Sequence, residues 1–473
     1  MKIQTITMRA LVVAMAACGV IAGGVRAQDS QPEEKPKPAA KAYGPIGAEN
    51  QDQNQSPDAM LPDNRPLTGI QDPTIGAPPE QHSYWVPGLS YYNFANSNGQ
   101  TQGGGSGWNS TSYVSGNVSL LENFSRSQFM LNYSGGGDFS TDSAQGNGWF
   151  SQLGTSMVFN WERWQLTLLD QFAYLPQSQF GFGGGTGLSL PGIGGSLGSG
   201  STGLGGGLNP GGSIFSSIGP RYTNSAGAQI NYSITPRSSV TLGGVYGLLR
   251  FTESGNIESN NYTANAGYNY QISRQDTIGV VYRFNSFHYI GLPQALGDHT
   301  IQAAYSRKIT GKLALQLTGG PEITEYRMPQ LGSTKTQYIS GAASANLSYA
   351  VAKGSVGLSY QHGVTSGSGV FVGAMTDQVT GSASRSLTRV WSGGMHAGFS
   401  RNRNAETAPG LANPSFNSVF AGGSIGRPLG RNANFTLGYT AYLETTNNVG
   451  GYSFTTHQVS LGLSWHSRPL VLR

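Results

Sequence analysis

Apolar and polar residues alternate with a period of two along most of the chain beyond residue 83, in segments of about ten to fourteen residues. The clearest segment is 222–234. Its apolar positions are Tyr222, Ala226, Ala228, Ile230, Tyr232 and Ile234, and its polar positions are Thr223, Ser225, Gln229, Asn231 and Ser233. The same alternation returns in 261–272, 277–285, 300–307 and 339–351. Because successive side chains of a strand point to opposite faces, these segments predict strands with one apolar and one wet face.

The connections between these segments fall into two classes that alternate along the chain. The short connections are 125–127, 162–163, 235–238, 273–276, 309–312, 352–355 and 387–389. The long, Gly-rich or irregular ones are 134–147, 176–220, 252–260, 289–298, 327–336, 365–374 and 401–414. Short turns on one rim and long loops on the other are typical of an outer-membrane β-barrel.

Aromatic residues gather near the short connections and near residue 465. They are Trp161, Trp164, Tyr232, Tyr270, Tyr305, Tyr349, Trp391 and Trp465, on the apolar face wherever the alternation is clear. Aromatic pairs can stabilise neighbouring strands anywhere in a sheet. Their position at one end of each strand instead predicts a girdle at a membrane interface, because these rings have an apolar body and a polar tip.

The pattern predicts an all-β fold, a transmembrane antiparallel up-and-down barrel of about eighteen strands, with sixteen as the alternative. Strands are expected to start near residues 84, 111, 128, 148, 164, 221, 239, 261, 277, 299, 312, 337, 355, 375, 390, 415, 432 and 452. The first strand is the weakest, because Pro87 and Gly88 interrupt it. Long loops at 95–110 and 445–451 are consistent with both termini on the periplasmic side.

The region before the barrel divides into two parts. Residues 1–27 predict a signal peptide, with Lys2 and Arg9 before an apolar run and Val25-Arg26-Ala27 as a small-residue cleavage pattern. The alternative to an ordinary signal peptide is a lipoprotein signal, with Cys18 as the lipid-modified cysteine. Residues 28–82 are rich in Pro, Gln and Asn and poor in large apolar residues, which predicts a disordered periplasmic arm before a barrel at 83–473. The arm is a spacer, a partner-binding segment or a pore plug.

Composition narrows the function. Only 11% of residues are charged and 70 are glycine, which is unusual for a water-solvated surface. Without the three basic residues of the signal, the net charge of +5 falls to +2, so nothing indicates binding to nucleic acid. Cys18 is the single cysteine, so the mature chain is no disulfide scaffold.

In this architecture, over about residues 84–466, the chain resembles the bacterial porin-like barrels, including the eighteen-stranded sugar- and solute-specific porins. No family motif is matched residue by residue. Porin-type chains commonly end in an aromatic residue read by the outer-membrane assembly machinery. This sequence ends WHSRPLVLR, so Leu461, Leu463 and Trp465 are the alternative signal, with the last residues as a periplasmic tail.

Catalytic, cofactor and metal sites are not expected. The seven histidines accompany no G-x-S-x-G segment, and the glycines precede no helix with a Lys-Ser/Thr pair. His288 and His299, with Asp298 adjacent, flank the loop 289–298 and are the weak candidate for a dyad or a metal site. The segment before the barrel is too short for the plug of a TonB-dependent transporter or the passenger of an autotransporter.

Transport through the interior remains. The pore-lining residues predicted from alternation are Gln229, Asn231, Asn265, Asn269, Gln271, Arg283, Gln302, Glu322 and His396, with Lys308 of the same parity. Amides and hydroxyls with few charges favour passive diffusion of small polar, neutral solutes. The alternatives are a conduit for polysaccharide export and a structural or adhesive surface barrel. The expected partners are outer-membrane lipid, the assembly machinery, and small polar solutes or polysaccharide; association between copies of the chain stays open.

Two features are less regular. Asp170 shares the parity of the apolar residues Leu166, Leu168 and Phe172, and a β-bulge near Leu169 is expected to turn it inward. The loop 176–220 joins the fifth and sixth strands and carries no acid. The resemblance to porins implies that a loop in this place folds inward and narrows the pore, whereas its Gly and Ser content also suits a flexible loop. The constriction candidates are Leu188, Leu190, Ile193, Leu197, Leu204 and Leu208.

Overall fold

The computed structural model of the chain describes residues 83–97, 107–141, 146–175, 220–327, 335–367, 372–405, 415–446 and 453–471. The predicted signal peptide, the arm 28–82 and residues 176–219 of the long loop lie outside these ranges. So do all six leucine and isoleucine constriction candidates, from Leu188 to Leu208. Within the described ranges, no helix is long and apolar enough to cross a membrane.

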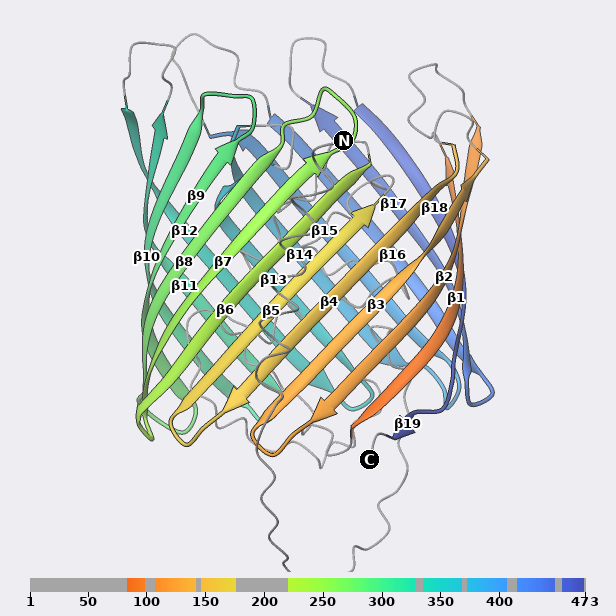
Figure 1. Cartoon of the computed structure of the whole chain (residues 1–473), viewed down its shortest axis with the longest axis horizontal. Helices are drawn as coiled ribbons and strands as arrows, with labels where there is room; N and C mark the ends of the chain where they lie inside the picture. The colour runs from red at the N-terminus through yellow and green to blue at the C-terminus, as the bar shows by residue number, and fades with distance from the viewer. Residues whose placement is uncertain are drawn as a thin grey trace, which may run out of the picture. The chain divides into compact units, whose positions relative to one another are not determined.

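Eighteen antiparallel strands form one closed barrel (Figure 1). They are β1 (Tyr84–Ser97), β2 (Trp108–Asn123), β3 (Ser127–Ser140), β4 (Gly148–Asn160), β5 (Trp164–Leu175), β6 (Arg221–Thr235), β7 (Ser238–Phe251), β8 (Ser259–Gln271), β9 (Asp276–Tyr289), β10 (Ala295–Thr310), β11 (Leu313–Arg327), β12 (Lys335–Val351), β13 (Gly354–Thr365), β14 (Ala374–Ser386), β15 (Ser392–Asn404), β16 (Ser415–Leu429), β17 (Ala433–Thr446) and β18 (Ser453–His466). Each strand pairs with its neighbours in sequence, and β1 pairs with β18, which closes the sheet. The predicted count of eighteen is confirmed.

The ends of the barrel differ from the prediction in two places. A short additional strand, β19 (Leu470–Val471), pairs with Tyr84 and Trp85. The first strand is not interrupted at Pro87, which keeps its register with Val118 on β2. Proline donates no hydrogen bond, but the Pro87 carbonyl oxygen still accepts one from the Ser467 N–H at 2.9 Å. The strand therefore continues through the proline next to the end of β18.

The two faces of the sheet carry the predicted alternation. On β8, the polar residues Asn261, Thr263 and Asn265 are buried, whereas Tyr262 and Tyr268 between and beyond them are exposed. The buried face is the inner one. Its Tyr289 on β9 donates a hydrogen bond to the Ser366 carbonyl oxygen, which follows β13, and strands so far apart in the sheet contact each other only across the interior.

Aromatic rings mark two levels on the outer face. Near the short turns, the rings of Trp164 and Tyr232 lie 4.3 Å apart, centroid to centroid. Ten residues along the same two strands, towards the long connections, Tyr174 and Tyr222 form a second pair at 4.5 Å. Between the two levels the outer positions of β5 and β6 are largely apolar, with Asp170 and Asn224 as the exceptions.

The expectation of a bulge that turns Asp170 inward is wrong. Strand β5 keeps an unbroken register with both neighbours, and Asp170 pairs with Thr155 and Ala226 on the outer face. Its Oδ1 instead accepts a hydrogen bond from the Asn224 Nδ2 at 2.8 Å, also on the outer face. A local polar partner on the neighbouring strand thus replaces the register shift, because one hydrogen bond satisfies part of the carboxylate without distorting either ladder.

Candidate functional site

A continuous polar row crosses the inner face of five strands. The register pairs Asn265 on β8 with Arg283, Arg283 with Thr300, Thr300 with Glu322, and Glu322 with Ser340 on β12. Residues paired across strands have Cβ atoms about 5 Å apart, so these side chains form one row. The interior wall of β8–β12 therefore offers amide, hydroxyl, guanidinium and carboxylate groups side by side.

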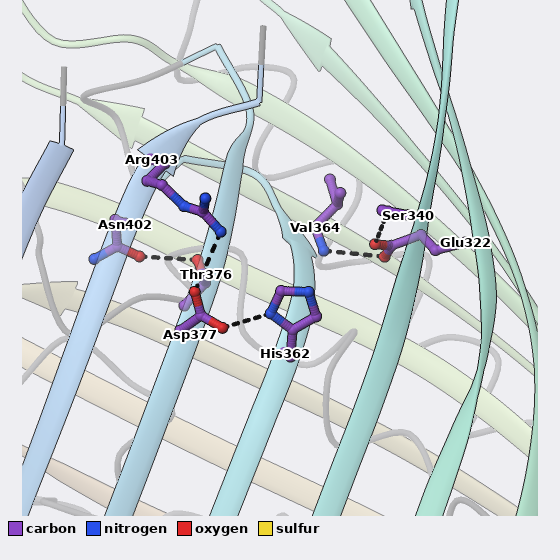
Figure 2. A network of polar contacts seen from close by, with 8 residues as sticks. All are labelled: Glu322, Ser340, His362, Val364, Thr376, Asp377, Asn402 and Arg403. Carbon is purple, nitrogen blue, oxygen red and sulfur yellow. Dashed lines mark hydrogen bonds and ion pairs between the residues drawn. The ribbon is translucent and has the colours of Figure 1, made fainter. Parts of the chain in front are cut away.

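The two carboxylates of this wall are almost fully buried, Asp298 being 1% exposed and Glu322 2%. The Asp298 Oδ2 accepts hydrogen bonds from Asn285 Nδ2 at 3.0 Å and Thr300 Oγ1 at 3.2 Å, and its Oδ1 has no partner. Glu322 accepts from Ser340 Oγ at 2.9 Å and from the Val364 N–H at 3.0 Å (Figure 2). Buried carboxylates need such donors because desolvation penalises the charged form.

Arg283 lies close enough to both acids to interact with them electrostatically, but it forms no direct ion pair with either. Among the described residues it has no ion-pair or hydrogen-bond partner. A guanidinium carries five N–H donors in a fixed plane, so Arg283 can donate to an oxygen-rich solute that reaches this wall. The wall therefore contains donors and acceptors of both charge signs, of which the Asp298 and Glu322 carboxylates are almost fully buried.

The last residues of β13 and the residues that follow them fold against this wall. Strands β12 and β13 pair only between Ala343–His362 and the short turn that joins them, although both strands continue beyond Ala343 and His362 towards the long connections. Beyond that pair, towards the long connections, the Val364 N–H donates a hydrogen bond to the Glu322 carboxylate of β11 instead of to a backbone oxygen of β12. A side-chain carboxylate thus takes the place of a strand ladder.

The same segment is held by an apolar cluster on the inner face. The cluster consists of Phe287, Tyr289, Leu296 and Tyr326, with Val364 and Val372 packed against it. Gly373 has a φ of 79°, and a Cβ atom there would lie 2.8 Å from Leu296 Cδ1, so glycine suits this return of the chain. The inward-folded segment, defined as residues 363–367 and 372–373, is therefore a narrowing element that the sequence analysis did not identify.

Most predicted pore-lining residues lie on the inner face of the same half of the barrel. Four of them, Asn265, Arg283, Gln302 and Glu322, come together on β8–β11. Asn269 and Gln271 lie further along β8, nearer the short turns. Gln229 and Asn231 lie on β6, where the Gln229 Nε2 donates to Asn231 Oδ1 at 3.2 Å. The ninth, His396, lies apart on β15, beside Phe420 with ring centroids 6.1 Å apart.

The opposite half of the interior is aromatic. Counting around eighteen strands, β1 lies nine strands from β10, and the inner face of β1, β2 and β4 holds a buried cluster of Tyr92, Phe94, Tyr113 and Phe150. Phe420 and Tyr442 extend it on β16 and β17, with ring centroids 5.8 Å apart. One wall of the interior is thus rich in hydrogen-bonding groups and the other in rings.

Charges of both signs occur on the inner face of the described strands. Three are cationic and four anionic: Arg221, Arg283, Lys308, Asp138, Asp298, Glu322 and Glu444. On the described strands, the formal charges of the inner face therefore nearly balance, and most of its polar side chains are uncharged.

The list of pore-lining residues predicted from the sequence lacked Asp298, Asn285 and Thr300. The long connection predicted at 289–298 ends earlier in the structure, because β10 starts at Ala295. The alternation of Leu296, Asp298, Thr300 and Gln302, all buried on one face, was the signal that would have extended the strand.

The weak candidate for a dyad or a metal site, formed by His288, His299 and Asp298, is wrong, because the histidines and the aspartate do not meet. His288 and His299 lie on the outer face of β9 and β10, whereas Asp298 lies on the inner face. His299 Nδ1 is instead 2.8 Å from the Tyr282 hydroxyl oxygen. Adjacent residues of one strand point to opposite faces, so Asp298 cannot orient His299. Among the described residues, no three His, Cys, Asp or Glu side chains are grouped as metal ligands.

Comparison with known proteins gives similarity at the level of the fold. No protein-family model and no curated protein sequence matches the chain. Among solved structures, the chain is similar to a BenF-like porin from Pseudomonas fluorescens Pf-5, with a TM-score of 0.44 and 10% identity over 83% of this chain and 99% of that chain. It is also similar to Pseudomonas aeruginosa OccK2 (OpdF), with a TM-score of 0.43 and 9% identity over 82% of this chain and 98% of that chain. For Pseudomonas aeruginosa OpdL the TM-score is 0.41 and the identity 12%, over 83% and 99%. At these values the likeness carries no argument about solute or mechanism.

Proposed function

We propose that this protein is an outer-membrane, porin-like channel for passive diffusion of small polar, neutral solutes. The observation that carries the proposal is the spacing of the two aromatic levels on the outer face. Trp164 and Tyr174 are ten residues apart on β5, as are Tyr232 and Tyr222 on β6. At about 3.3 Å per residue and a strand tilt near 40°, ten residues span about 25 Å along the barrel axis. That height matches the apolar band of outer-membrane barrels.

The two ends of the barrel support an orientation. Strands β1 and β18 begin and end at the rim of the short turns, where β19 also pairs with Tyr84 and Trp85. In outer-membrane barrels the short turns are periplasmic and the long loops extracellular. We therefore place the ends of the barrel domain on the periplasmic side and the inward-folded segment towards the cell exterior.

The preference for neutral solutes rests on the inner face. Amides and hydroxyls such as those of Asn265, Gln302 and Thr300 dominate the polar wall, and its charges nearly balance. Donors and acceptors without a strong field exchange hydrogen bonds with a hydroxylated solute and impose little penalty on either ion sign. The aromatic wall opposite adds flat apolar surface.

Single-channel recording of the purified full chain in a planar bilayer tests the proposal. A steady conductance, with a reversal potential near zero across a KCl gradient, supports a channel with a balanced interior. Liposome swelling should then be faster with sugars than with charged solutes of equal size. A strongly shifted reversal potential would overturn the neutral preference while leaving the channel intact.

Two outcomes would favour other functions. In the first, the full chain conducts no current, and a current appears only after deletion of residues 176–219. That result would indicate a gated conduit, as for polysaccharide export. Absence of current in both forms, with the barrel still folded, would favour a structural or adhesive barrel.

A further inference from the structure

A histidine, an aspartate and an arginine form a network on the outer face of β13–β15, near the ends of the strands that meet the long connections (Figure 2). The His362 Nδ1 lies 2.5 Å from Asp377 Oδ1, and the Arg403 Nη2 lies 3.4 Å from Asp377 Oδ2. The register pairs His362 with Asp377 and Asp377 with Arg401, so a second arginine flanks the same carboxylate. These four residues, His362, Asp377, Arg401 and Arg403, are called the outer charged cluster.

The cluster faces away from the interior. Asp377 and Arg401 alternate with the inward Thr376 and Asn402, which are buried and share a hydrogen bond of 2.8 Å. Arg401 is exposed, and the side chain of Arg403 is 38% exposed. Arg401 has no hydrogen-bond or ion-pair partner among the described residues. The Nε of Arg403 is buried, so the donors that Arg403 offers at the surface are those of its terminal nitrogens. The cluster thus keeps donors available on the outer surface.

The aromatic spacing fixes the height of the cluster. Arg401 lies ten residues beyond Trp391, the same spacing that separates the two aromatic levels on β5 and β6. One step closer to the middle of the strands, the outer face is apolar, with Tyr360, Val379 and Phe399 exposed on β13, β14 and β15. If the aromatic levels mark the membrane interfaces, the cluster lies at the level of the lipid headgroups on the side of the long connections.

The charged groups at that level favour the binding of an anion. Two guanidinium groups and an imidazole surround one carboxylate, so the cluster retains excess positive charge and unused N–H donors. Asp377 holds Arg403 and His362 in place, which lowers the entropy lost when an oxyanion is bound. Guanidinium groups match the geometry of phosphate oxygens, and a membrane interface is where lipid phosphates are found at high density.

We propose that the outer charged cluster binds the phosphate of an anionic lipid headgroup, with Arg401 and Arg403 as the donors and Asp377 as the residue that positions Arg403. The inference rests on the proposed membrane placement of the barrel and not on solute transport. A barrel that conducts no solute would still bind lipid in this way, so the bilayer recording and the lipid measurement fail independently.

Native mass spectrometry of the full chain in maltoside micelles tests the proposal, with lipid A, dephosphorylated lipid A and inorganic phosphate as probes. Lipid A should remain bound, and dephosphorylation should abolish the bound species. Arg401→Gln and Arg403→Gln should each weaken lipid A binding about fivefold, as expected for one basic residue at an anionic membrane surface. Arg401→Lys should keep most of the binding, because the charge remains.

Arg385→Gln is the matched control. Arg385 is an exposed arginine on the outer face of β14, but it lies at the short-turn end. Its replacement should leave lipid A binding unchanged, and every variant should keep the electrophoretic mobility of the folded barrel. Equal binding by wild type and both cluster variants would overturn the proposal. Displacement of lipid A by inorganic phosphate at the same concentration would overturn the assignment to a lipid.

Discussion

Glu322 is expected to hold the inward-folded segment in place, and Glu322→Ala tests this directly. The substitution removes the acceptor of the Val364 N–H at 3.0 Å and of the Ser340 hydroxyl at 2.9 Å. The Val364 amide then has no partner from β12, because pairing of β12 with β13 stops at His362. Leaving one buried donor unpaired costs about 2 kcal/mol, which corresponds to about a 30-fold increase in local opening.

Hydrogen–deuterium exchange of the full chain in maltoside micelles measures this opening. Peptides covering the inward-folded segment should exchange about 30-fold faster in the alanine variant, whereas peptides of β5 should be unchanged. Glu322→Gln is the matched control. Its amide oxygen can still accept from the Val364 N–H, and its amide nitrogen can donate to Ser340, so its exchange should stay near that of the wild type.

Two results would refute this reasoning. Exchange in Glu322→Ala within twofold of the wild type would mean that the apolar cluster around Tyr289 alone holds the segment. Equal acceleration in the alanine and glutamine variants would mean that the carboxylate charge, and not the hydrogen bonds, is responsible.

Three further substitutions, one of them with a matched control, test other parts of the structure. Asp170→Asn should raise the free energy of unfolding in lipid vesicles by about 1 kcal/mol, because a charge leaves the apolar outer face; a decrease, measured by urea titration, would contradict the outward placement. Gly462→Ala should lower that free energy by about 1–3 kcal/mol, because a Cβ atom would overlap the buried Tyr92 ring. Gly116→Ala, with no atom within 4 Å of the added Cβ, should have no comparable effect. Tyr289→Phe removes the 3.1 Å hydrogen bond to the Ser366 carbonyl oxygen and should speed hydrogen–deuterium exchange of the inward-folded segment about fivefold. Unchanged exchange would mean that this hydrogen bond does not hold the segment.

The sequence by itself determined the barrel. Alternation with a period of two, turns such as those at 162–163 and 235–238, and rings such as Trp164 and Tyr232 are local features that each strand carries. They were sufficient to predict eighteen strands and to place Asn265, Arg283, Gln302 and Glu322 on the polar face of their strands. A barrel is built from neighbouring strands in sequence order, so local pattern and global topology coincide.

Only the tertiary structure decided which of these residues meet and what narrows the interior. The contact of Glu322 with Val364 joins residues 42 positions apart and depends on where pairing of β12 and β13 ends. Likewise, the partner of Asp170 is Asn224, 54 positions away, and local pattern had suggested a bulge instead. Alternation reports the face of a side chain but not its neighbours on other strands. Register, strand separation and contacts across the interior come from the closed sheet, so the polar wall, the inward-folded segment and the outer charged cluster could be identified only there.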